Sequence, residues 1–286
     1  MLQKMHNFEA VYGARGDAAQ DPRNDQAQED MVLLTRAIEQ TFADMNDAFA
    51  SLSSIELSTF QERSVPTYLS AFDAIYTLNQ DLLLDLHYAE REFASSKSAS
   101  SYLPGIEVTR GWREGDVSLR NRVALQVSSD RQLDDLAQRF IKLHGSINWI
   151  DGEKGVMVIG TGKEQAIQGS ELLRWYQTLL HDDLRAGGTR LMAIGYGFMD
   201  SHINRVIAEA AKETGLVMYL VNPQGPAVLA SRRGDGGVKT GLDHVPLVGV
   251  STRTLAETFG DAHGSAALWG AGNNVSFRSF QRFVDA

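Results

Sequence analysis

Four short segments of this 286-residue chain place polar side chains directly after apolar stretches. They are Thr77-Leu78-Asn79-Gln80-Asp81, Leu143-His144-Gly145-Ser146, Gly195-Tyr196-Gly197-Phe198-Met199-Asp200 and Asn222-Pro223. In open α/β sheets, ligands bind at the carboxyl ends of the strands, where loops and helix amino termini meet. A helix beginning near Asp200 would point its free amide groups at that edge, which favours a phosphate. A neutral histidine in such a place can accept a proton near pH 7.

The elements that would carry the last two segments follow from apolar patterning. Residues 190–196 form an apolar run and predict a strand, and residues 216–222, closed by Pro223, predict another. Between them, Asp200 or Ser201 can cap a helix that Gly215 ends. Strand, helix and strand in about 33 residues predict a βαβ unit with parallel strands covered on both faces. Ser170 can likewise cap a helix that runs to Leu184 and stops before two glycines.

The first half of the chain predicts the elements that would carry the other two segments. Residues 71–78 predict a buried strand and residues 81–93 a helix, while Phe140–Leu143 and Val156–Ile159 predict short strands. From residue 30 to residue 52, one apolar stripe predicts a long helix, with Leu34, Ile38, Phe42, Met45, Phe49 and Leu52 on it. We expect this stripe to pack on its own domain, with a partner or oligomer helix as the alternative.

The remaining segments predict little regular structure. Residues 13–30 and the glycine-rich stretch 224–241 predict loops, and residues 94–130 an irregular insertion that includes a hairpin. Helices are expected near 252–259 and 277–284. We expect one α/β domain over residues 1–286, with a parallel sheet and helices on both faces.

Composition excludes several classes of function. A net charge of −9 disfavours direct nucleic-acid binding, which needs Lys and Arg to displace phosphate counterions. The absence of cysteine excludes disulfides, thiol nucleophiles and zinc sites built on thiolates. No run of 18 apolar residues and no signal-like start occur, so we expect a cytoplasmic protein that does not bind membranes.

The four polar segments resemble, in order, motifs of the sirtuin family. Residues 77–81 resemble the T-x-N-x-D signature, and Leu143-His144-Gly145-Ser146 the element with the catalytic histidine. Residues 195–203 resemble the Gly-Tyr-Ser-Phe-x-Asp-x-His-Ile element of divergent bacterial sirtuin-like proteins, and Tyr219–Pro223 the strand-ending asparagine. The resemblance covers about residues 71–223.

This resemblance implies a Rossmann-like fold that binds NAD and needs no metal. Asn79 would lie beside the nicotinamide ribose and hold the attacking water, and Asp81 would orient groups around the nicotinamide. His144 would act as the general base. The residues expected to bind the dinucleotide are Thr77, Gly145, Gly195, Tyr196, Gly197, Asp200 and Asn222.

Structural alternatives exist for most of these residues. Asn79 could be a turn or helix-capping residue, and Asp81 and Asp200 could cap the helices that follow them. His144 could be an ordinary histidine at a strand end. We expect His87 and His202 to be structural.

Two departures from the family pattern shape the expected function. Without cysteine, the zinc ribbon of protein-deacylating sirtuins cannot form, which favours NAD cleavage without a protein substrate, as in bacterial sirtuin-like proteins of anti-phage defence. The Gly-Ala-Gly-x-Ser element that opens the family's fold is also missing, and Gly13-Ala14-Arg15-Gly16 is its nearest equivalent. Either the chain is truncated at its start or its phosphate-binding loop has been lost.

These features predict an NAD hydrolase that releases nicotinamide and ADP-ribose, in a defence or stress role. The alternatives are a non-catalytic module that binds NAD or ADP-ribose and, third, a protein deacylase without zinc. A homo-oligomer or a defence-system protein is the expected protein partner.

Overall fold

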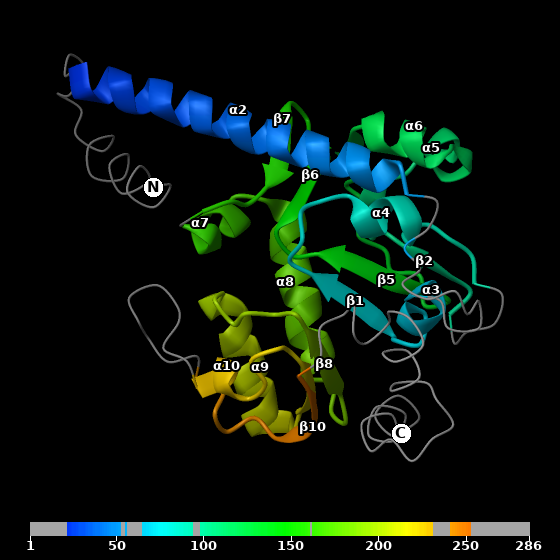
Figure 1. Cartoon of the computed structure of the whole chain (residues 1–286). Helices are drawn as coiled ribbons and strands as arrows, with labels where there is room; N and C mark the ends of the chain where they lie inside the picture. Colours follow the sequence, from blue (N-terminus) through cyan, green and yellow to red (C-terminus); the bar gives the residue numbers. More distant parts are fainter. Residues whose placement is uncertain are drawn as a thin grey trace. The chain divides into compact units, whose positions relative to one another are not determined.

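The computed structural model describes residues 22–52, 55, 65–93, 98–160, 162–230 and 241–252 (Figure 1). The chain divides into two compact units, each with its own three-stranded parallel sheet. Parallel strands with flanking helices confirm the predicted α/β, Rossmann-like class. Whether the whole chain acts as one domain stays a prediction. Among the described helices, none is long and apolar enough to cross a membrane.

The first unit holds the segments around Asn79 and His144. Its helices are α2 (Pro22–Ala50), α4 (Leu83–His87), α5 (Arg110–Glu114), α6 (Val117–Arg122) and α7 (Lys163–Gln168). Its strands are β1 (Ala74–Thr77), β2 (Ser100–Tyr102), β3 (Ile106–Glu107), β4 (Leu125–Val127), β5 (Ala137–Lys142), β6 (Gly145–Asp151) and β7 (Lys154–Met157). One sheet has the order β1-β5-β2, and the other has the order β3-β4-β6-β7.

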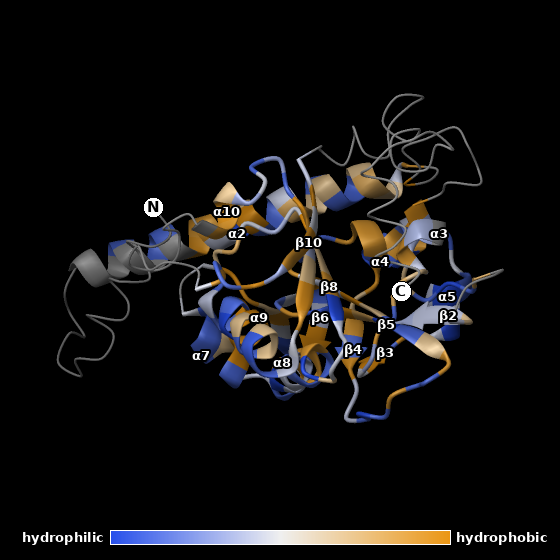
Figure 2. Ribbon diagram, turned by 90° about the horizontal axis from the view of Figure 1, so that it is seen from below, coloured by the Kyte–Doolittle hydropathy of each residue, from blue (hydrophilic) through white to orange (hydrophobic). Residues whose placement is uncertain are grey.

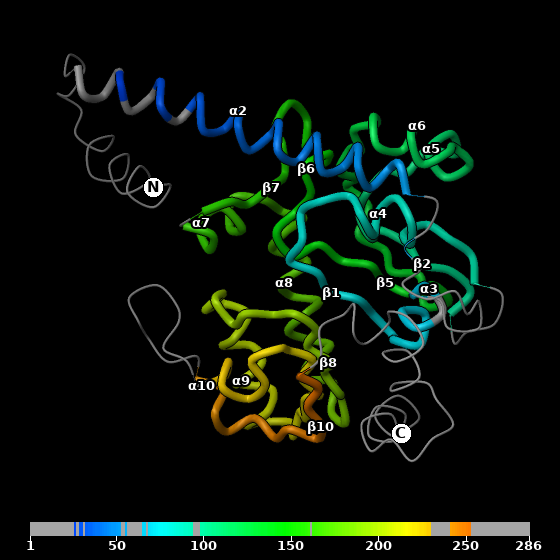
Figure 3. The backbone as a smooth tube through the Cα atoms, viewed as in Figure 1, coloured from blue at the N-terminus to red at the C-terminus, as the bar shows by residue number. Residues whose placement is uncertain are grey.

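The parallel sheet of this unit aligns the ends of two strands. β1 pairs with β5 so that Thr77 lies opposite Lys142, the last residue of each strand. The chain therefore leaves the sheet at the same edge after each of these two strands. Figure 3 traces it from β1 into α4 and from β5 into β6. Phe140 and Ile141 of β5 are fully buried, which anchors this strand in the core.

Helix α2 confirms the predicted long helix but begins earlier, at Pro22, so the loop expected over residues 13–30 is wrong for residues 22–30. A proline is favoured in the first turn of a helix, where its missing amide costs nothing. Near the other end of α2, Asn46 accepts a hydrogen bond from the Leu82 amide at 2.9 Å, and the Phe49 carbonyl bonds a His87 ring nitrogen. The carboxyl-terminal part of α2 thus packs on α4 of its own unit.

The second unit contains α3 (Val65–Leu69), β8 (Arg190–Ile194), α9 (Ser201–Thr214), β9 (Val217–Val221), α10 (Ala227–Ala230) and β10 (Leu247–Ser251). Helix α8 (Glu171–Leu184) continues from the first unit into this one. The sheet order is β10-β9-β8, with all strands parallel. The β8–α9–β9 unit confirms the predicted βαβ pattern, and Gly215 ends α9 in a left-handed conformation. Figure 2 shows α9 with both hydrophilic and hydrophobic residues, as expected for a helix that covers a sheet.

Several expectations differ from the structure. The helix expected over 81–93 spans only Leu83–His87, and Glu90 adopts a left-handed φ of 59° that no helix tolerates. Residues 98–130, part of the segment expected to be an irregular insertion, contain two short helices and three strands. The sequence predicts no strand at the positions of β6 and β10. The loop expected over 224–241 is wrong for residues 227–230, which form α10. Residues 231–240, residues 13–16 and the two helices expected in the tail lie outside the described residues.

Candidate functional site

The turn after β1 is held by its own side chains. The Thr77 hydroxyl accepts a hydrogen bond from the Asn79 amide at 3.1 Å, and Asp81 Oδ1 accepts one from the Leu83 amide at 3.0 Å. Thr77 and Asp81 are half-buried, whereas the Asn79 side chain is exposed. Asp81 thus closes the turn, but the N-cap position of α4 is Leu82, so the capping role considered for Asp81 is wrong. Asn79 keeps its side chain at the surface of the unit.

His144 lies at the equivalent place after β5. It is buried, with 3% of its surface exposed, and its carbonyl accepts the Val158 amide at 2.9 Å. Gly145 follows with a φ of +73°, and a Cβ atom there would lie 2.0 Å from the Val156 carbonyl oxygen. Only glycine fits this position, because both the conformation and the space exclude a side chain. The glycine of the His-Gly element thus has a structural reason in this chain.

Main-chain hydrogen bonds join the two turns. The Leu143 amide donates to the Thr77 carbonyl at 3.0 Å, and the Ile147 amide donates to the Gln80 carbonyl at 3.1 Å. The Gln80 side-chain amide donates to the Val158 carbonyl beyond β7. The structure therefore brings the Asn79–Asp81 turn and the His144–Gly145 turn side by side.

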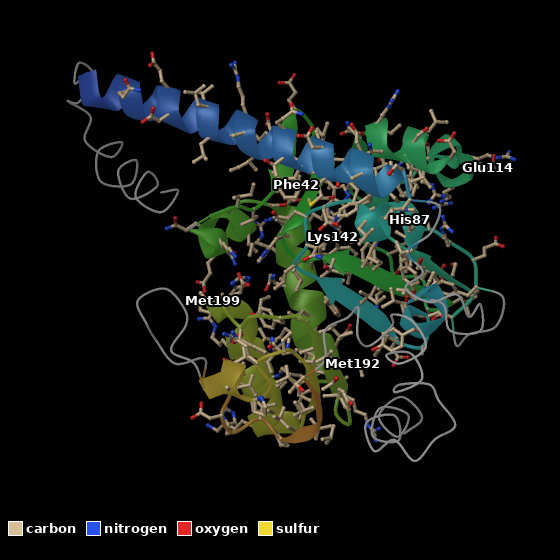
Figure 4. The ribbon with its side chains drawn as sticks, in the orientation of Figure 1. Phe42, His87, Glu114, Lys142, Met192 and Met199 are labelled. Carbon is tan, nitrogen blue, oxygen red and sulfur yellow. The ribbon has the colours of Figure 1, made fainter. Side chains whose placement is uncertain are left out.

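Lys142, labelled in Figure 4, contacts both turns and was not anticipated from the sequence. Its Nζ atom donates to the Asp81 carbonyl at 2.6 Å, to Asp85 Oδ2 at 2.7 Å and to Ser146 Oγ at 2.8 Å. Lys142 and Asp85 are each 1% exposed, and Ser146 is fully buried. Burial raises the pKa of Asp85, and the neighbouring ammonium opposes that shift. The signal in the sequence was a lone lysine inside the apolar run Phe140–Leu143.

The turn after β8 is built in a similar way within the second unit. Asn204, on α9, donates to the Phe198 carbonyl at 2.9 Å and accepts the Tyr196 hydroxyl at 3.0 Å. Phe198 is fully buried with a φ of +53°, an uncommon conformation for a bulky residue. Burial, with a smaller effect of the Asp200 charge, raises the pKa of Tyr196, so its hydroxyl stays a donor. Asn204 was missed because nothing in its local sequence pattern sets it apart.

Asn222 closes this turn from β9. Its side-chain amide donates to the Tyr196 carbonyl at 3.0 Å, and its oxygen accepts the Gln224 amide at 2.9 Å. Asp200 occupies the N-cap position of α9, but its side chain makes no capping hydrogen bond, so that alternative is wrong for the side chain. Gly195 has a φ of +63° with open space around it, and Gly197 is half-buried beside it. Contacts of these residues with a dinucleotide stay predictions.

His87 lies outside these turns. The His87 ring bonds the Phe49 carbonyl at 2.9 Å and joins α4 to α2, in agreement with a structural role. In the part of the chain that the structure describes, no three His, Asp or Glu side chains gather as a metal site would require.

A protein-family model covers both sets of turns. No match is found among curated proteins. The family model of the SIR2-like domain matches residues 73–238, which is more than half of the chain and includes every predicted site residue. Proteins of this family are typically NAD-dependent enzymes. The chain therefore belongs to the SIR2-like domain family.

Proposed function

We propose that this protein hydrolyses NAD to nicotinamide and ADP-ribose. The observation that carries the proposal is the pairing of the Asn79–Asp81 turn with His144 at the ends of β1 and β5, two parallel neighbours. These residues lie within the SIR2-like match and are of the types that NAD hydrolysis needs.

The chemistry assigns each residue one task. The bond between the nicotinamide nitrogen and the ribose carbon breaks, and nicotinamide leaves with the electron pair. The Asn79 amide oxygen holds a water molecule that attacks the resulting oxocarbenium-like carbon, and Asp81 orients the groups around the nicotinamide. His144 accepts the proton that the water loses, which a neutral imidazole can do near pH 7. The products are nicotinamide, ADP-ribose and one proton.

In this proposal, the residues that follow β8 and β9 bind the dinucleotide, as their resemblance to the family implies. The backbone of Gly195, Tyr196 and Gly197 approaches the phosphates and a ribose, with α9 following at Asp200, and Asn222 lies by the adenosine ribose. A rigid turn suits this task because it loses little freedom when a ligand binds. The hydrogen bonds from Asn204 and Asn222 to the turn support that rigidity.

The decisive experiment is nicotinamide release from NAD by the folded protein. His144→Ala should lower the rate by roughly 10²–10⁴-fold, the contribution of a general base. His181→Ala is the matched control, since His181 lies on α8 with 43% of its side chain exposed and its ring bonds its neighbour Asp182. Equal rates for wild type and His144→Ala would remove His144 from the mechanism.

One alternative belongs to a different class of function. A non-catalytic module would bind NAD or ADP-ribose without releasing nicotinamide, and the missing Gly-Ala-Gly-x-Ser element in the sequence favours this reading. Calorimetric titration with both nucleotides, run beside the release assay, separates binding with turnover from binding alone. A deacylase would release nicotinamide only when an acylated peptide is added.

The biological setting in this proposal is bacterial defence in the cytoplasm. The resemblance of residues 195–203 to divergent bacterial sirtuin-like proteins supports it. Expression in a bacterial host, followed by phage infection, should lower cellular NAD with the wild type and not with His144→Ala. Unchanged NAD in both cultures would contradict the defence role without bearing on the activity in vitro.

A further inference from the structure

We infer that Lys142 is a positioning residue of this site, a buried ammonium group that holds the Asn79–Asp81 turn against the His144 turn. The inference deepens the proposed function and rests on it for its catalytic consequence. The hydrogen bonds of Lys142 are observed in the structure whether or not the protein hydrolyses NAD.

The ammonium group joins three segments that are distant in the sequence. Its three protons go to the Asp81 carbonyl, to Asp85 on α4 and to Ser146, two residues after His144. A lysine side chain has three donors, so its capacity is filled. Ser146 in turn approaches the Gln80 carbonyl at 3.4 Å and adds a second link to the first turn.

Fold stability alone does not account for this arrangement. Replacing a buried ion pair by packed apolar side chains of similar volume is often neutral or stabilising, because desolvation of both charges is costly. Asp85 Oδ1 is buried and has no hydrogen-bond partner among the described residues, so this pair is incompletely satisfied. An apolar pair would fill the same space but would donate nothing to the Asp81 carbonyl or to Ser146. What the lysine adds is the fixed position of the two turns.

The catalytic consequence follows because the reaction rate depends steeply on the positions of the reacting groups. A displacement of about 1 Å in a reacting group can cost about 10²-fold in rate. Without Nζ, the Asp81 carbonyl loses a buried donor and the Ser146 hydroxyl loses the group that fixes it. The bonds at Thr77, Gln80 and Leu82 remain, so the turn stays folded but the end that carries Asp81 is held less firmly. NAD affinity depends less on this geometry than the chemical step does.

The test compares two ways of removing the ion pair. Lys142→Met alone leaves Asp85 as an unpaired buried carboxylate and should destabilise the protein strongly. The double variant Lys142→Met with Asp85→Leu should recover the melting temperature of the wild type, yet its kcat should fall about 10²-fold with KM changed less than about threefold. A double variant with wild-type kcat would overturn the inference. Arg120→Met is the matched control, since Arg120 is a buried cation stacked on Trp112 in the same unit. Its kcat, measured per folded molecule, should not change.

A second readout needs no activity. In the double variant, amide hydrogen exchange over residues 78–83 and 144–147 should be faster than in the wild type, with α6 unchanged. Ser146→Ala keeps the ion pair and should show the same acceleration in smaller degree, and it decides the question should the double variant not fold. Wild-type exchange in these segments would overturn the inference. Failure of the wild type to release nicotinamide would instead overturn the proposed function and leave the exchange result to judge Lys142.

Discussion

Gly145→Ala tests the geometry of the His-Gly turn most directly. A Cβ atom at this position would lie 2.0 Å from the Val156 carbonyl oxygen, whereas real Cβ contacts are essentially never shorter than 3.0 Å. The chain must therefore yield by about 1 Å near β7. That displacement threatens the hydrogen bond from the Val158 amide to the His144 carbonyl, at 2.9 Å. The backbone also has a φ of +73°, which an alanine adopts only with strain.

The expected loss can be worked from these terms. Left-handed strain costs roughly 1–2 kcal/mol, and a lost hydrogen bond roughly 0.5–1.5 kcal/mol. Together they lower the free energy of unfolding by about 1.5–3.5 kcal/mol before any further repacking. Gly162→Ala is the matched control, because Gly162 belongs to the same unit and is left-handed, with its nearest neighbour, a Gln165 side-chain oxygen, 3.8 Å away. It should lose only the strain, roughly 1–2 kcal/mol.

Urea unfolding followed by circular dichroism measures both variants. Gly145→Ala should lose about 0.5–1.5 kcal/mol more than Gly162→Ala, by the hydrogen-bond cost above. It should also release nicotinamide more slowly per folded molecule, since His144 is displaced with its carbonyl. Equal losses in the two variants would refute the reasoning, because the contact with the Val156 carbonyl would then carry no cost.

Three further substitutions probe the turns. Asn79→Ala should lower kcat for nicotinamide release more than it raises KM, because a group that holds water acts mainly in the transition state; a rise in KM alone in steady-state kinetics would make Asn79 a binding residue. Asp81→Asn retains the oxygen that accepts the Leu83 amide, so the melting temperature should hold while kcat falls; an unchanged kcat would leave Asp81 with only its structural bond in the turn. Asn204→Ala removes two hydrogen bonds and should lower the free energy of unfolding by roughly 1–3 kcal/mol and weaken NAD binding in calorimetry; unchanged affinity would separate this turn from the ligand.

The sequence alone determined the parallel units and the polar residues at their strand ends. Residues 190–222 contain every local signal needed for a βαβ unit: an apolar run, a helix with one apolar side, a terminal glycine and a second apolar run. The structure confirms β8, α9 and β9 there because each element depends mainly on its own residues. The same reasoning identified the turns after β1 and β5, since polar residues that follow an apolar strand must leave the sheet at its carboxyl end.

Only the tertiary structure decided how those turns are held. Lys142 and Asp85 are 57 positions apart, and no periodic pattern links a lysine in a strand to an aspartate in a helix that precedes it in the chain. The sequence motif presents Gly145 as a binding residue, but the position requires glycine because its φ is +73° and the Val156 carbonyl of β7 leaves no space for a side chain. Helix α4 ends at His87, where Tyr88 leaves the helical conformation, and the Leu82 amide before the helix is fixed by Asn46 of α2. Local patterning fixes which face of an element is buried. The partners of a buried polar group are set by which distant segments the folded chain brings within hydrogen-bond distance.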